Sequence, residues 1–170
     1  MKKSFITLLL AVATVTLFSQ ENDVDKANEA ISNFKKTNSE IEKFFNSAYG
    51  YAVFPGIGKG GLGVGGAAGK GVVYQGGAPV ADTKMSQVTI GFQAGGQKYA
   101  EVIFFEDERA YTRFVADKFE FAAQVSAVAL QSGVSLDAKY TDGILVFTIA
   151  IGGLMYEASI GGQKFKTEMY

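Results

Sequence analysis

Glycine is concentrated in one stretch of this chain. Eleven of the 21 glycines fall between Gly56 and Gly77, interleaved with aliphatic residues such as Val64 and Val72. Glycine weakens a regular helix and is used where two backbones approach closely or where φ is positive. The tract therefore predicts glycine-rich strand and turn, with a mobile loop as the alternative. We expect added Cβ atoms to clash, or φ to be positive, at five positions: Gly60, Gly61, Gly63, Gly65 and Gly66.

The residues before the tract have a helical pattern. Between Asn22 and Ser47, apolar residues recur at steps of three and four, which favours a helix that packs on the core over one that inserts into a membrane. Asn38 interrupts this stripe, and Ser39 with Glu42 matches a capping box. We therefore expect two helices, or one helix broken near Asn38.

The residues after the tract alternate as strands do. Val88 to Phe92 alternates in polarity, a turn follows, and Tyr99 to Phe105 returns. The turn sequence of residues 94–99 reappears at residues 160–165, which predicts a second, similar hairpin. Residues 144–151 are apolar on both faces, as in a central buried strand.

One further helix is expected near residues 107–115. The acidic residues Glu106, Asp107 and Glu108 stand at its start, where negative charge stabilises a helix. Residues 119–130 fit helix or strand, and their small, β-branched alternation favours a strand. The predicted fold class is α+β, with N-terminal helices packed on a glycine-rich antiparallel sheet or partly closed β-barrel. Closure would explain how so many strands avoid exposed edges.

The N-terminus has the pattern of a secretory signal peptide. Lys2 and Lys3 precede an uncharged run from Phe5 to Phe18, which is too short to span a bilayer. We expect residues 1–20 to be removed and residues 21–170 to form a single domain. The mature protein is then exported, either periplasmic or secreted, and could lie at a membrane surface.

The composition argues against several classes of function. The chain has no Cys and no His, which removes most zinc sites and every triad that depends on histidine. Without the signal peptide, 14 basic residues face 17 acidic ones, which argues against nucleic acid as a partner. The sequence at residues 56–61 matches G-x-G-x-x-G, but glycines continue where a helix should begin, so no nucleotide site is expected. We expect no enzyme, cofactor or metal; a hydrolase that uses carboxylates alone is a remote alternative.

Several segments, taken in order, resemble the SYLF domain family. Residues 48–55 read AYGYAVFP and precede Lys59-Gly60-Gly61 and the long glycine tract, and together they look like the opening of a SYLF domain. Three later segments and the end of the domain follow in the family's order, at residues 71–74, 91–95, 126–133 and 152–162. The resemblance covers Asp23 to Phe165, and it is closest to the exported, single-domain bacterial members.

The resemblance implies a non-enzymatic role at a phospholipid or membrane surface. Family members bind acidic phospholipids, particularly phosphoinositides, and some yeast relatives bind actin. Members that bind phosphoinositides use a basic N-terminal helix, whereas residues 21–43 carry four lysines against six acidic residues here. Actin binding is therefore not carried over, and these helices are expected to attract an anionic surface only weakly.

The candidate lipid contacts are five lysines. Lys59 and Lys70 flank the glycine tract, where missing side chains would let a headgroup approach backbone N–H groups. Three lysines on the polar side of the N-terminal helices would add a weaker attraction: Lys35, Lys36 and Lys43. Two alternatives remain. These lysines could only keep the surface soluble, or the protein could be a structural module of the cell envelope that binds a protein partner through a sheet edge.

Overall fold

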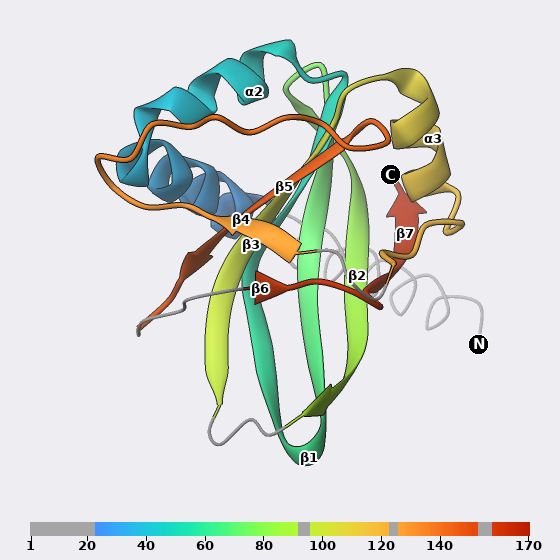
Figure 1. Cartoon of the computed structure of the whole chain (residues 1–170). Helices are drawn as coiled ribbons and strands as arrows, with labels where there is room; N and C mark the ends of the chain where they lie inside the picture. The colour runs from blue at the N-terminus through green and yellow to red at the C-terminus, as the bar shows by residue number, and fades with distance from the viewer. Residues whose placement is uncertain (1–22, 92–95, 123–125, 153–157) are drawn as a thin grey trace, which may run out of the picture.

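The computed structural model describes residues 23–91, 96–122, 126–152 and 158–170 (Figure 1). The expected signal peptide lies outside these ranges. So does the first half of the turn expected at residues 94–97, the first of the two similar turns. Among the described residues, no helix is long and apolar enough to cross a membrane.

The N-terminal helices are broken at Asn38, as predicted. A helix spans residues 23–37, followed by the 3-10 helix η1 (Ser39–Ile41) and by α2 (Glu42–Ser47). The expected capping box is wrong, because the cap is Asn38, one residue earlier. Its backbone is extended, and its side chain accepts a hydrogen bond from the amide of Glu40 at 3.0 Å.

Strand β1 (Gly50–Gln75) contains nearly the whole glycine tract and folds back on itself. Residues 50–59 pair with β3 (Gln97–Phe105), whereas residues 63–75 pair with β2 (Ala78–Gly91). The two arms lie side by side, since a Cβ on Gly71 would stand only 2.6 Å from the carbonyl oxygen of Val53. Figure 1 shows the arms meeting in a turn at the lower end of the sheet. The tract is therefore strand and turn, and the loop alternative is wrong.

The glycines of the tract differ in whether the backbone could accommodate a Cβ atom. Gly61 has φ of +146°, and a Cβ there would overlap Gly65. A Cβ at Gly66 would lie 3.3 Å from the Gln87 carbonyl oxygen, which is a tight contact. Gly60 departs from the expectation, because a Cβ there would meet nothing within 4 Å. For Gly63 and Gly65 the expectation stays a prediction.

In the described ranges, the sheet has seven strands in the order β6-β4-β5-β3-β1-β2-β7. The remaining strands are β4 (Ser126–Ala129), β5 (Ile144–Ala150), β6 (Ala158–Ser159) and β7 (Lys164–Met169). Only the β4–β5 pair is parallel; the other pairs are antiparallel. With the helices, this sheet confirms the α+β class and the inner position predicted for residues 144–151.

The second expected hairpin is wrong. β6 and β7 are joined by only four residues, but β6 pairs with β4 while β7 pairs with β2, at the other end of the sheet order. The connecting residues carry the chain across the sheet instead of turning it back. The Phe121 amide donates to the Gln163 carbonyl at 3.2 Å, and the Gln163 side chain reaches Glu101 on β3.

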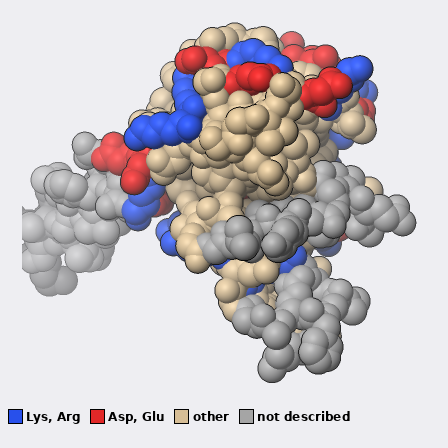
Figure 2. Space-filling model, turned by 60° about the vertical axis from the view of Figure 1, so that its left-hand side comes forward, with Lys and Arg blue, Asp and Glu red and all other residues tan. Residues whose placement is uncertain are grey.

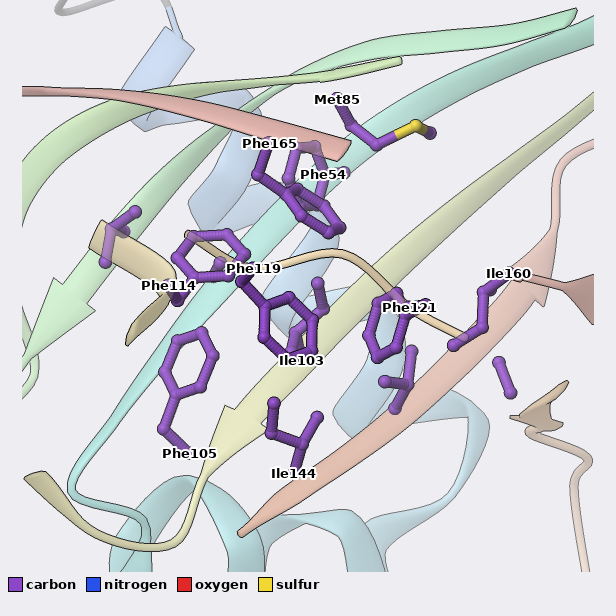
Figure 3. Close-up of a cluster of buried hydrophobic side chains, with 14 of the residues drawn as sticks. Phe54, Met85, Ile103, Phe105, Phe114, Phe119, Phe121, Ile144, Ile160 and Phe165 are labelled. Atoms are coloured by element: carbon purple, nitrogen blue, oxygen red, sulfur yellow. The ribbon is translucent and has the colours of Figure 1, made fainter. Parts of the chain in front are cut away.

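Both faces of the sheet are buried. The N-terminal core lies between the sheet and the N-terminal helices, and it includes Phe34, Phe44, Phe104 and Phe147. The α3 core lies on the other face, under α3 (Glu108–Val115), the further helix predicted near residues 107–115. Figure 3 shows part of the α3 core, with rings from β1, β3, α3 and β7 packed together, among them Phe54, Phe105, Phe114 and Phe165.

Candidate binding cleft

The structure places the two lysines that flank the glycine tract on opposite faces of the sheet. Lys59 pairs with Gln97 and follows the α3-core residue Ile57 by two positions; since side chains alternate along a strand, it faces the α3 side. Partial burial lowers the pKa of Lys59. Lys70 pairs with Lys84 and faces the N-terminal helices. The two lysines therefore do not form one surface.

Two of the three lysines on the N-terminal helices have partners within the protein. Lys35 lies 3.0 Å from Glu42 and 5.4 Å from the centre of the Phe45 ring. Lys43 donates to the Leu136 carbonyl at 3.0 Å. These contacts fix the helices to one another and to the segment before β5. Lys36 is exposed, and the structure does not bring any of the three together with Lys70.

A cleft of about 540 Å³ lies between the first helix and the strands beneath it. Three lysines border it: Lys26 from the helix, Lys70 from β1 and Lys98 from β3. The helix also supplies the carboxylates of Asp23 and Glu29. Aliphatic side chains complete the lining: Ala30, Ala100, Ile149 and Ile151. The cleft thus combines positive charge, negative charge and an apolar wall.

Glycine shapes this cleft at two positions. A Cβ on Gly56 would lie 2.9 Å from Cε of Lys98, so glycine allows the lysine stem to lie over the β1 backbone. Gly71, where the arms of β1 touch, also lines the cleft. The tract therefore contributes to a site, although at glycines other than those singled out in the sequence.

The lysines of the cleft form only weak ion pairs with the described carboxylates of the protein. Asp23 lies 4.0 Å from both Lys26 and Lys70, and such exposed pairs contribute little to stability. Among the described residues, no carboxylate lies within ion-pair distance of Lys98. An ammonium group without a partner is available to an anionic ligand, and lysine donates hydrogen bonds to phosphate oxygens as a point charge.

Sequence reasoning missed Lys98 as a site residue. The signal was present, because Lys98 precedes Tyr99 in an alternating strand, and a buried tyrosine turns its neighbour to the opposite face. The sequence predicted the N-terminal helix, but it did not show that this helix lies over the face that carries Lys98.

A buried acid lies outside the cleft. Glu101 is fully buried on the α3 face and accepts a hydrogen bond from Nε2 of Gln163 at 3.1 Å. Burial raises the pKa of Glu101 to about 8, partly offset by that hydrogen bond. The carboxyl group has no exposed surface and does not line the cleft, so its contacts point to a role in the core.

Comparison with known proteins gives one partial similarity. No family model matches the chain. The chain is similar to "Beta cell expansion factor A" of Aeromonas veronii, with 34% identity over 82 residues, which are 48% of this chain and 31% of that protein. The match thus spans about a third of the relative's length, and its printed name does not state what that protein binds.

Proposed function

We propose that this protein binds phospholipid headgroups at a membrane surface, as an exported SYLF-like domain without catalytic activity. The observation that carries the proposal is Lys98, an ammonium group without a carboxylate partner in the part of the chain that the structure describes, beside Lys26 and Lys70 in one cleft. The family resemblance and the signal-peptide pattern support the same function. Neither a cofactor nor a metal takes part in it.

The charges of the cleft suit a zwitterionic or anionic headgroup. The phosphate would lie against Lys70 and Lys98, which border the cleft from the two sides of the first arm of β1. Asp23 and Glu29 would face a headgroup ammonium or hydroxyl group. The glycerol and the first methylene groups would contact Ile149 and Ile151, because these apolar side chains line the same cleft as the lysines. Binding of this kind is reversible, because each lysine near an anionic surface contributes about 1 kcal/mol.

We further propose that the sheet forms a partly closed barrel around the α3 core. Its end strands β6 and β7 are separated by four residues in the chain, and Gln163 spans from this connection to Glu101 on β3. A barrel would give the cleft a rigid floor. Slow amide hydrogen exchange along both β6 and β7 would support closure, whereas rapid exchange along one of them would contradict it.

Flotation with phospholipid vesicles tests the proposed function. The mature protein, residues 21–170, would be mixed with vesicles of phosphatidylcholine alone or of phosphatidylcholine with phosphatidylglycerol. We expect it to float with the second at low salt. The double variant Lys70→Gln, Lys98→Gln should bind roughly 30-fold more weakly, from about 1 kcal/mol for each charge.

The matched control is Lys35→Gln, Lys36→Gln, which removes the same charge from the helical end. If both double variants lose affinity equally, net charge and not the cleft decides binding. If the unmodified protein stays in the bottom fraction with every lipid, the lipid function is wrong and a protein-binding envelope module is favoured. One observation weakens that alternative: the carboxylate of Asp117 already accepts the Thr167 amide on the edge strand β7.

A further inference from the structure

Charge is unevenly distributed along the chain. Residues 50–100, which form β1, β2 and the start of β3, hold four lysines and one acidic residue, for a net charge of +3 in a chain with a formal net charge of −1. The one acid, Asp82, accepts a hydrogen bond from the Tyr170 hydroxyl at 2.8 Å, near the end of β7. The lower end of these strands therefore contributes positive charge, and the nearby carboxylate of Glu120 lies 3.5 Å from the ammonium group of Lys164, in the part of β7 that pairs with β2.

Two apolar side chains stand out at the same end. Val64 and Val88 are 68% and 75% exposed, the highest values among the large hydrophobic residues that the structure describes. Val64 follows the turn of β1, and Val88 pairs with Gly66 on the adjacent strand. Figure 1 shows this turn at the lower end of the sheet, far from α2 and α3.

Both valines share a face of the sheet with Lys70 and Lys84. Along β2, alternate residues from Ala81 to Gln87 are buried on the α3 side, so Val88 and Lys84 point away from it. The unbroken register from Gly63 to Val73 puts Val64 on the same face as Lys70. This face also holds the cleft. Figure 2 shows lysines among uncharged residues in the lower projection, whereas acidic side chains gather mainly at the helical end.

We propose that Val64 and Val88 enter the interface of an anionic bilayer when the protein binds, with the lysines behind them at headgroup level. Lys84 lies four residues from Val88, about 13 Å at the usual rise of a strand, and a lysine stem can extend along an apolar surface to place its charge in the headgroup region. The inference rests on the proposed function and names the part of the molecule that contacts the acyl chains.

A bilayer fits this surface better than a protein partner does. The lower end of β1 and β2, here called the tip, is built largely of glycine, with open space where a Cβ would lie at Gly58 and Gly60. It therefore offers few side chains for a specific protein contact. An anionic membrane needs no shape match: it needs exposed apolar groups flanked by cations. The lower end of β1 and β2 meets that requirement.

The absence of tryptophan from the chain permits a direct test. Single variants Val64→Trp and Val88→Trp each place one fluorophore at the tip. Val134→Trp is the matched control, because Val134 is 54% exposed and its carbonyl accepts from Asn38 at the helical end. With vesicles of phosphatidylcholine and phosphatidylglycerol, we expect a blue shift at positions 64 and 88. We also expect quenching there by phosphatidylcholine brominated on its acyl chains, and neither effect at position 134.

A second variant separates insertion from any affinity that tryptophan adds. Val64→Ser with Val88→Ser should weaken vesicle binding at least threefold, and Val134→Ser should leave it unchanged. Flotation of the Trp variants without quenching at position 64 or 88, or wild-type binding by the double serine variant, would overturn the inference while leaving the proposed function intact. Failure of the unmodified protein to float would overturn both.

Discussion

The two faces of the sheet are buried in different ways. The N-terminal core is assembled from apolar and aromatic side chains, such as Phe44, Phe104 and Phe147. The α3 face combines a comparable set of rings with fully buried polar residues, namely Glu101, Thr148 and Gln163. The first core is stabilised by the area it removes from water. The second also depends on hydrogen bonds and on the protonation state of a carboxyl group.

The polar residues of the α3 face mark where the chain crosses it. Gln163 donates to Glu101 from the short connection between β6 and β7, and its Nε2 also lies 3.4 Å from the Tyr99 hydroxyl. Glu101 and Thr148 pair directly on β3 and β5. We interpret the cluster as fixing the position of the crossing segment, since buried polar groups disfavour alternative packings in which they would lose their partners.

Truncation of Phe147 should give the largest effect. Its ring lies 5.4 Å from that of Phe44 and 6.0 Å from that of Phe104. Phe147→Ala leaves a cavity in the apolar core and should lower the free energy of unfolding by about 3–5 kcal/mol. Urea denaturation measures this. A loss below about 1 kcal/mol would show that the N-terminal core is loosely packed. It would contradict the view that this core is stabilised mainly by buried apolar area.

The close contact between the two arms of β1 should give the next largest effect on stability. These arms belong to the sheet that lies between the two cores. Gly71→Ala puts a Cβ 2.6 Å from the Val53 carbonyl oxygen and 2.7 Å from the Phe54 ring, so the arms must move apart, at a cost of about 1–3 kcal/mol. Gly60→Ala is the matched control, with nothing near its Cβ. Equal thermal unfolding temperatures for the two variants would contradict the close approach of the arms.

The buried acid predicts a pH dependence confined to the α3 face. The folded pKa of Glu101, about 8, lies above the ordinary glutamate value of 4.5, so the folded state holds the proton more tightly than the unfolded state. Its contribution to stability is complete below about pH 4.5 and is lost as the pH rises through about 8. Glu101→Gln keeps a neutral group of similar shape and should remove this slope.

Urea denaturation at several pH values between those limits compares the two proteins. The unmodified protein should lose stability with rising pH relative to Glu101→Gln. Parallel pH profiles would mean that Glu101 does not titrate in this range. Phe147→Ala should lower stability without changing the slope, because the ionisable groups described in the core around it are tyrosines, and burial raises their pKa values further above this pH range.

The helix caps on the two faces should give the smallest difference. Asn38 is 8% exposed, caps η1, and donates to the carbonyls of Gln131 and Val134 at 3.1 and 2.7 Å. Asp107 caps α3 from an exposed position, where its side chain accepts a hydrogen bond from the Ala110 amide at 2.8 Å. Asn38→Ala should cost about 2 kcal/mol and Asp107→Ala about 1 kcal/mol. A larger decrease in the unfolding temperature for Asp107→Ala than for Asn38→Ala would contradict the stronger contribution expected from the buried Asn38 cap.

The sequence predicted the features that depend on neighbouring residues. The helix near residues 107–115, the break at Asn38 and the inner strand at 144–151 follow from local periodicity and capping chemistry. The partners of β6 and β7 were not predictable from the same signals, because a short glycine-containing connection fits both a hairpin and a crossing. Lys98 and Glu101 were missed because their roles depend on a helix and a glutamine that are distant in sequence.

The pairing of β7 has a consequence for the order of folding. β2 pairs with β7 through residues such as Ala81 and Met169, which stand far apart in the chain, while β6, just before β7, pairs elsewhere. During synthesis, one edge of β2 therefore stays open until residues 164–169 arrive. Contacts of such long sequence separation form late and slow the final step, and an open strand edge can pair with another chain. The nascent protein is most exposed to aggregation in that interval.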